Sequence, residues 1–158
     1  MQNFLRKRID RDEEGFTLIE LMVVVMIIAI LIAIAVPTFL GARERSQERA
    51  AQSNLRTAFT AAKTFYTDNQ AWDAAVTEAV LDASEPSIDF AAAASTDAKD
   101  ISFTVTAASD TIVLTNHSDN DECFWIRDVA GTTNYAQTSA TSCNSAAPPA
   151  AGWSADGW

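Results

Sequence analysis

GFTLIELMVVVMIIAILIAIAVP, the stretch from Gly15 to Pro37, sets the organisation of the whole chain. Between Phe16 and Leu40 the only ionisable side chain is that of Glu20. At 1.5 Å per residue, a helix over this segment is about 37 Å long, which exceeds the roughly 30 Å thickness of a hydrocarbon core. The sequence therefore predicts a membrane-spanning helix at 16–40 that carries one carboxylate.

The position of the Glu20 carboxylate in an apolar segment requires an energetic explanation. A charged side chain at the centre of a membrane helix costs roughly 2.5 to 3.5 kcal/mol, and less toward the ends. Glu20 lies near the start of the segment, where the positive end of the helix dipole favours a negative charge by about 0.3 to 1 kcal/mol. Glu20 is therefore either a functional group that pairs with a cation or a helix cap near the headgroups.

The residues alone allow two interpretations of the apolar segment. The first is a permanent single-pass anchor with the head outside, because long domains translocate regardless of charge. The second is a secretory signal peptide cut after the small residues Ala33 and Ala35. This second interpretation is disfavoured, because Glu20 stands at the start of the apolar region and the removed core would exceed the usual 7 to 15 residues.

A third interpretation rests on a resemblance. The run from Gly15 to Glu20, followed by an uninterrupted apolar stretch and Pro37, resembles the N-terminal signature of type IV prepilins and pseudopilins. The resemblance extends to about Tyr66 and includes a short charged leader, residues 1–15. It implies that a prepilin peptidase cuts after Gly15 and that Phe16 becomes the N-methylated first residue. Glycine suits a protease that must approach the backbone closely.

The resemblance also implies how subunits assemble. Glu20 would pair with the N-terminal amine of a neighbouring subunit's Phe16, which removes the cost of a buried acid only in the correct register. Pro37 would kink or locally open the helix, because proline removes a backbone donor. In the family this region can unwind, and Ala29 here stands where a glycine is common.

The function implied is that of a structural subunit in a type IV pilus-like filament. The implied partners are further copies of the chain, a prepilin peptidase, an assembly ATPase and a membrane platform protein. The chain would reside in the cytoplasmic membrane, head outside, and later in an extracellular filament. The alternatives are a pseudopilin or minor pilin of a secretion or competence system and, less favoured, a membrane-anchored enzyme or binding domain.

After the apolar segment the chain predicts an amphipathic stem, 41–67, and a head, 68–158. Apolar residues at helical spacing form one face of the stem: Leu55, Ala58, Phe59, Ala62, Phe65 and Tyr66. The head contains a predicted short helix at 72–81, ended by Glu85 and Pro86, strands at 101–105, 111–114 and 123–129, and a weaker strand from Asn134 and Tyr135. The predicted fold class is α+β, a long N-terminal helix packed on a small antiparallel sheet.

The head holds both cysteines, Cys123 and Cys143. Outside the cytoplasm they predict a disulfide, which would stabilise the head by about 3 kcal/mol, whereas in the cytosol two free thiols would be expected. The tail places Trp153 and Trp158 in a Pro/Gly/Ala-rich stretch. These tryptophans either pack against the head or offer aromatic contacts to a partner.

The charge of the chain, −10, is unevenly distributed. From Phe65 onward, Lys99 and Arg127 are the only basic residues among many acids, and such a field argues against nucleic-acid binding by the head. The stem is basic overall. Its charged face is either solvated or meets the acidic head of another subunit. This face consists of Arg43, Glu44, Arg45, Glu48 and Arg49.

The sequence contains no GxSxG, HExxH or P-loop motif. His117 is the only histidine, which excludes a multi-histidine metal site or a His-based catalytic set with a second histidine within one chain. The acids between Asp119 and Glu122 lack the spacing of an EF-hand and predict a solvated turn. Asn116 begins a weak glycosylation sequon. We therefore expect no enzyme activity, metal or cofactor.

Overall fold

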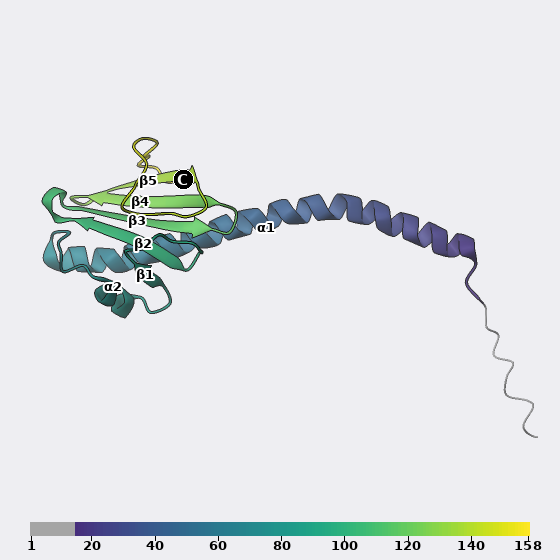
Figure 1. Cartoon of the computed structure of the whole chain (residues 1–158), viewed down its shortest axis with the longest axis horizontal. Helices are drawn as coiled ribbons and strands as arrows, with labels where there is room; N and C mark the ends of the chain where they lie inside the picture. The colour runs from purple at the N-terminus through teal and green to yellow at the C-terminus, as the bar shows by residue number, and fades with distance from the viewer. Residues whose placement is uncertain (1–14) are drawn as a thin grey trace, which may run out of the picture. The chain divides into compact units, whose positions relative to one another are not determined.

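The computed structural model describes residues 15–158 (Figure 1). The chain divides into two compact units, Met1–Leu40 and Gly41–Trp158. The predicted leader, apart from Gly15, lies outside the described residues. One helix, α1 (Leu18–Asn69), begins in the first unit and ends in the second.

In the first unit, α1 is an apolar helix whose apolar side chains are not buried by any of residues 15–158. Every residue from Gly15 to Leu40 is exposed, and Phe16 is 87% exposed. The helix includes Pro37 without an interruption in its assignment. Next to the proline, the Thr38 hydroxyl donates hydrogen bonds to the carbonyl oxygens of Ile34 (3.3 Å) and Ala35 (2.9 Å). The kink at Pro37 stays a prediction.

In the second unit, the remainder of α1 packs on a five-stranded sheet (Figure 1). The strands follow the order of the chain, with β1 parallel to β2 and the other neighbours antiparallel. Their bounds are β1 (Asp89–Ala91), β2 (Asp100–Thr106), β3 (Thr111–Ser118), β4 (Glu122–Val129) and β5 (Thr132–Ser139). The α+β fold class is therefore confirmed.

Two parts of the head differ from the sequence prediction. The predicted helix at 72–81 was wrong, because α2 spans Glu78–Ser84 and Trp72 lies in the preceding loop. Trp72 is instead held by tertiary hydrogen bonds from its backbone and its indole to Asp110 and Asp128. The weak fourth strand is a full strand, β5, whose turn from β4 consists of Ala130 and Gly131 with positive φ angles of 49° and 87°.

The core lies between α1 and one face of the sheet. Residues of β4 alternate between the two faces, so Phe124 and Ile126 meet α1 whereas Trp125 faces the other way. The stem contributes mainly small residues and one large one, which bring helix and sheet close: Ala51, Leu55, Ala58, Ala61 and Ala62. Phe59, Phe65 and Tyr66 pack at the rim, so the predicted apolar face of the stem is confirmed.

The C-terminal segment covers the opposite face and the β5 edge. The predicted disulfide joins Cys123 and Cys143, with 5.6 Å between their Cα atoms. Farther along, Ser154 exchanges two backbone hydrogen bonds of 2.8 Å with Tyr135 of β5, which partly covers an edge that would otherwise be open. Both tryptophans pack on the head, Trp153 beside the disulfide and Trp158 against Phe124.

Candidate functional site

The first candidate site is the beginning of α1, where Thr17 and Glu20 bond to each other reciprocally. Oε2 of Glu20 accepts hydrogen bonds from the backbone N–H (2.9 Å) and the hydroxyl (2.7 Å) of Thr17. The backbone N–H of Glu20 in turn donates to Oγ1 of Thr17 at 3.3 Å. This is a capping box, which satisfies amide groups that the helix itself leaves unpaired. In the isolated chain Glu20 therefore acts as a helix cap.

The predicted cleavage point lies directly before this cap. Gly15 and Phe16 are both exposed and precede the helix. A Cβ atom added at Gly15 would meet no atom of the described residues within 4 Å. Phe16 lies four residues before Glu20, in the segment that precedes the helix. The structure thus places the predicted processing and assembly residues together at one helix end.

The apolar part of α1 supplies the second feature of this site. It is long and apolar enough to cross a membrane, and none of its most apolar window is buried within residues 15–158. A soluble core helix would have been buried on one side. The segment is therefore suited to an apolar environment that the single chain does not provide.

A second cluster, which the sequence analysis missed, ties the stem to the head. Nζ of Lys63 on α1 lies 2.8 Å from Oδ2 of Asp128 on β4, and the Asp128 side chain is fully buried. The same carboxylate accepts hydrogen bonds from the indole of Trp72 (2.8 Å), the hydroxyl of Thr133 (2.8 Å) and the N–H of Gly131 (3.0 Å). We call these five residues the Asp128 cluster.

Electrostatics in the Asp128 cluster favour the ionised acid. Burial acts to raise the pKa of Asp128, but hydrogen bonds from Lys63, Trp72 and Thr133 together lower it below its ordinary value. Lys63 also lies over the rings of Tyr66 and Trp72, at 4.5 and 5.6 Å from their centroids. In the sequence, the only signal that could have suggested a buried acid is the lone Lys63 within the apolar stripe of the stem.

The acidic turn between β3 and β4 is exposed at Asp119 and Asp121, as predicted for a solvated turn, and it also forms hydrogen bonds to the stem. Nε2 of Gln47 donates to Asp119 at 2.9 Å, and Nδ2 of Asn120 donates to Glu48 at 2.8 Å. Within residues 15–158 no group of three or more His, Cys, Asp or Glu residues could hold a metal ion. The turn therefore links the β3–β4 hairpin to the stem.

The glycosylation sequon is not usable in the folded head. Asn116 is fully buried in β3, and its Nδ2 donates to the carbonyl oxygen of Ala98 at 2.9 Å. His117 is also buried, and its Nε2 lies 3.5 Å from Oδ1 of Asp121, a long separation for a hydrogen bond. Asn116 and His117 are therefore both enclosed within the folded head.

Comparisons with known proteins agree with the N-terminal site. Residues 10–36 match the model of the prokaryotic N-terminal methylation motif. Over 61 residues the chain is 42% identical to the type IV major pilin protein PilA of Myxococcus xanthus (strain DK1622). That match covers 39% of this chain and 28% of the relative. No solved structure matches the chain significantly.

The methylation motif includes Gly15, Phe16 and Glu20, and it overlaps the exposed apolar part of α1. The chain therefore carries this N-terminal motif and is similar to a type IV major pilin over part of its length.

Proposed function

We propose that the chain is a structural subunit of a type IV pilus-like filament that polymerises through its N-terminal helix. The observation that carries this proposal is the methylation motif at 10–36, which overlaps a segment whose residues from Phe16 to Leu40 are all exposed. These side chains would lie in lipid before assembly and against other helices in the filament core. Each subunit repeats the same contacts, which builds an open helical assembly.

Processing comes first in this proposal. A prepilin peptidase cuts between Gly15 and Phe16 on the cytoplasmic side, and the amine of Phe16 is methylated. Exposure of both residues and the open space around Gly15 support this step. Removal of the leader frees a cationic amine on Phe16, four residues before Glu20 in the sequence.

Glu20 then guides assembly. Its carboxylate, which the Thr17 cap holds at the end of α1, receives the amine of Phe16 from a neighbouring subunit. An ion pair in an apolar core is favourable only when both charges meet, so a subunit out of register leaves two buried charges. The pair would therefore select the correct axial position.

The same proposal specifies what drives extraction of the subunit from the membrane and where the chain resides. Exchange of lipid for helix contacts around Phe16 to Leu40 supplies little net driving force, so an assembly ATPase acting through a membrane platform protein extracts the subunit. The chain crosses the cytoplasmic membrane once, with the head outside, and becomes extracellular in the filament. A pseudopilin or minor pilin remains the alternative, with the same processing and a short filament.

The deciding experiment is mass spectrometry of the N-terminal peptide of the protein from its native cells. A chain that begins with methylated Phe16, recovered in sheared surface filaments, supports the proposal. The same N-terminus with no long filaments favours a pseudopilin or minor pilin. An intact Met1 or a start at Val36 contradicts processing by a prepilin peptidase.

A further inference from the structure

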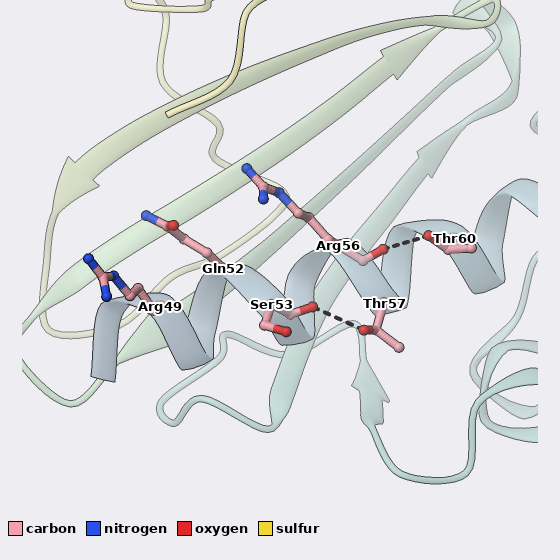
Figure 2. Close-up of a pocket in the computed structure, with 6 residues that line it drawn as sticks. All are labelled: Arg49, Gln52, Ser53, Arg56, Thr57 and Thr60. Atoms are coloured by element: carbon pink, nitrogen blue, oxygen red, sulfur yellow. Dashed lines mark hydrogen bonds between the residues drawn. The ribbon is translucent and has the colours of Figure 1, made fainter. Parts of the chain in front are cut away.

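The stem part of α1 carries an open polar groove of about 390 Å³ on its exposed side (Figure 2). Figure 2 shows the side chains of Arg49 and Arg56 extending from the same side of the helix. They are seven residues apart, which is about two turns or about 10 Å. All the residues that line the groove come from α1: Arg49, Gln52, Ser53, Arg56, Thr57 and Thr60.

The positive charge of the groove has no ion-pair partner among residues 15–158. Within residues 15–158 the ion pairs are those of Lys63 and His117, so neither groove arginine is in a salt bridge there. The guanidinium carbon of Arg56 lies 4.9 Å from the ring centroid of Trp158. Stacking fixes the plane of a guanidinium and leaves its N–H edge free for a carboxylate. The guanidinium of Arg56 is thus positioned by Trp158 and can still donate hydrogen bonds to an anionic partner.

The complementary charge is present on the same chain, around α2. Glu78 and Asp82 lie at i and i+4 on one face of α2, and Glu85 follows as the C-cap residue of that helix. The row from Glu78 to Glu85 spans seven residues, as does the row from Arg49 to Arg56. Two rows of opposite charge therefore have the same length of about 10 Å.

Each of the three carboxylates uses one of its two oxygens to accept hydrogen bonds from its own chain. Glu78 accepts the N–H of Ala92 at 2.9 Å, and Asp82 accepts the N–H of Phe90 at 3.2 Å. Glu85 accepts the hydroxyl of Ser87 at 2.6 Å. These hydrogen bonds use Oε1 or Oδ1, so the second oxygen of each carboxylate is available to a guanidinium.

We propose that the groove between Arg49 and Arg56 binds the acidic face of α2, formed by Glu78, Asp82 and Glu85, from a second copy of this chain. The inference rests on the proposed filament and names a head-to-stem contact in it. The groove and the acidic face are different surfaces, so the contact is heterologous and repeats from copy to copy. Matched rows of charge fix the register of such a contact.

Charge reversal tests the contact in cells that make the filament. The double substitution Arg49→Glu and Arg56→Glu places like charges opposite each other, and it should lower the yield of sheared filament by about tenfold or more. Adding Glu78→Lys and Glu85→Lys to the same chain restores opposite charges and should restore most of the yield. A quadruple variant as defective as the double variant overturns the proposal.

Arg43→Glu, compared with Arg49→Glu, is the matched control. Arg43 is exposed on the same helix, but it lies about 120° around the axis from the groove arginines. It should keep near-normal yield, and an equal loss in both single variants would contradict a specific groove. Thermal unfolding of each detergent-solubilised variant, followed by circular dichroism, must show a folded head, so that loss of contact is separated from loss of structure.

Photo-cross-linking separates this inference from the proposed function. The photoreactive amino acid p-benzoylphenylalanine replaces Gln52 in the full chain, and products are mapped in filaments and in concentrated detergent solution. Cross-links to residues 78–89 of another copy support the contact, even if no filament forms and the proposed function fails. Cross-links only elsewhere, in filaments of normal yield, overturn the contact and leave the filament proposal standing.

Discussion

Nζ of Lys63 and Oδ2 of Asp128 lie 2.8 Å apart, and this ion pair joins α1 to β4 where the carboxylate is fully buried. Asp128 also receives the N–H of Gly131, in the turn between β4 and β5, and the indole of Trp72. One side chain therefore connects the stem, the loop after it and a hairpin. The Asp128 cluster therefore fixes the stem part of α1 on the sheet within the second unit.

Asp128→Ala should lower the free energy of unfolding by about 3 kcal/mol, the low end of the range for a broken buried pair. The low end applies because Lys63 is 29% exposed and its freed ammonium can reach water. Denaturant unfolding of the detergent-solubilised full chain, followed by tryptophan fluorescence, measures the change. Asp156→Ala, at an exposed site, should stay within about 0.5 kcal/mol of the wild type. Equal stability of both variants would contradict the role of the cluster.

The lowered pKa of Asp128 predicts how stability depends on pH. Because the folded pKa lies below the ordinary value of 3.8, the unfolded chain binds more protons between the two values. The stabilisation is present above the ordinary value and is lost as pH falls through the lowered one. Unfolding of the wild type and of Asp128→Asn, measured from about pH 6 to about pH 2, should therefore converge at low pH. A constant difference would show that ionisation is irrelevant.

The disulfide should stabilise the head without being needed for its sheet. Replacement of Cys123 and Cys143 by alanine opens a loop with a sequence separation of 20, which should cost about 3 kcal/mol. The two backbone hydrogen bonds between Ser95 and Cys143, at 2.8 and 2.9 Å, should be weakened first. Hydrogen exchange followed by mass spectrometry reports this as faster exchange near Ser95. Unchanged exchange there, with unchanged stability, would refute the prediction.

The sequence predicted the elements that depend on local pattern. The apolar run and the spacing of Leu55, Ala58 and Ala62 indicated one long helix and its buried face, because helical periodicity is local information. The β-branched and aromatic residues of β2 and β4 likewise indicated strands. Cys123 and Cys143 were found because the head holds no other cysteines.

The misses all depend on contacts between distant residues. Trp72 is outside a helix because Asp110 and Asp128 bind its backbone and indole. β1 has three residues and pairs in parallel with β2, which no local pattern shows. Lys63 and Asp128 are far apart in sequence, and only the packing of α1 on the sheet brings them together. Such pairings cannot be predicted from periodicity.

Glu20 offers a test that separates helix capping from ion pairing. Glu20→Gln keeps a side chain that can accept the Thr17 bonds of a capping box but removes the charge. Thr17→Val keeps the charge and removes the hydroxyl of the cap, at a cost of about 1 kcal/mol at the helix end. If Glu20 pairs with the amine of a neighbouring Phe16, Glu20→Gln should lose most filament, as Glu20→Ala should, while Thr17→Val should retain more.

Membrane insertion should be normal in all three variants, because the apolar segment up to Leu40 is unchanged and removal of a charge favours insertion. Membrane fractionation therefore serves as the control, and sheared filament yield is the readout. Normal filament yield in Glu20→Gln, with a defect in Thr17→Val, would assign Glu20 to the cap alone and remove the proposed ion pair. The charge of Glu20, and not its hydrogen bonds to Thr17, is the property that a neighbouring amine would require.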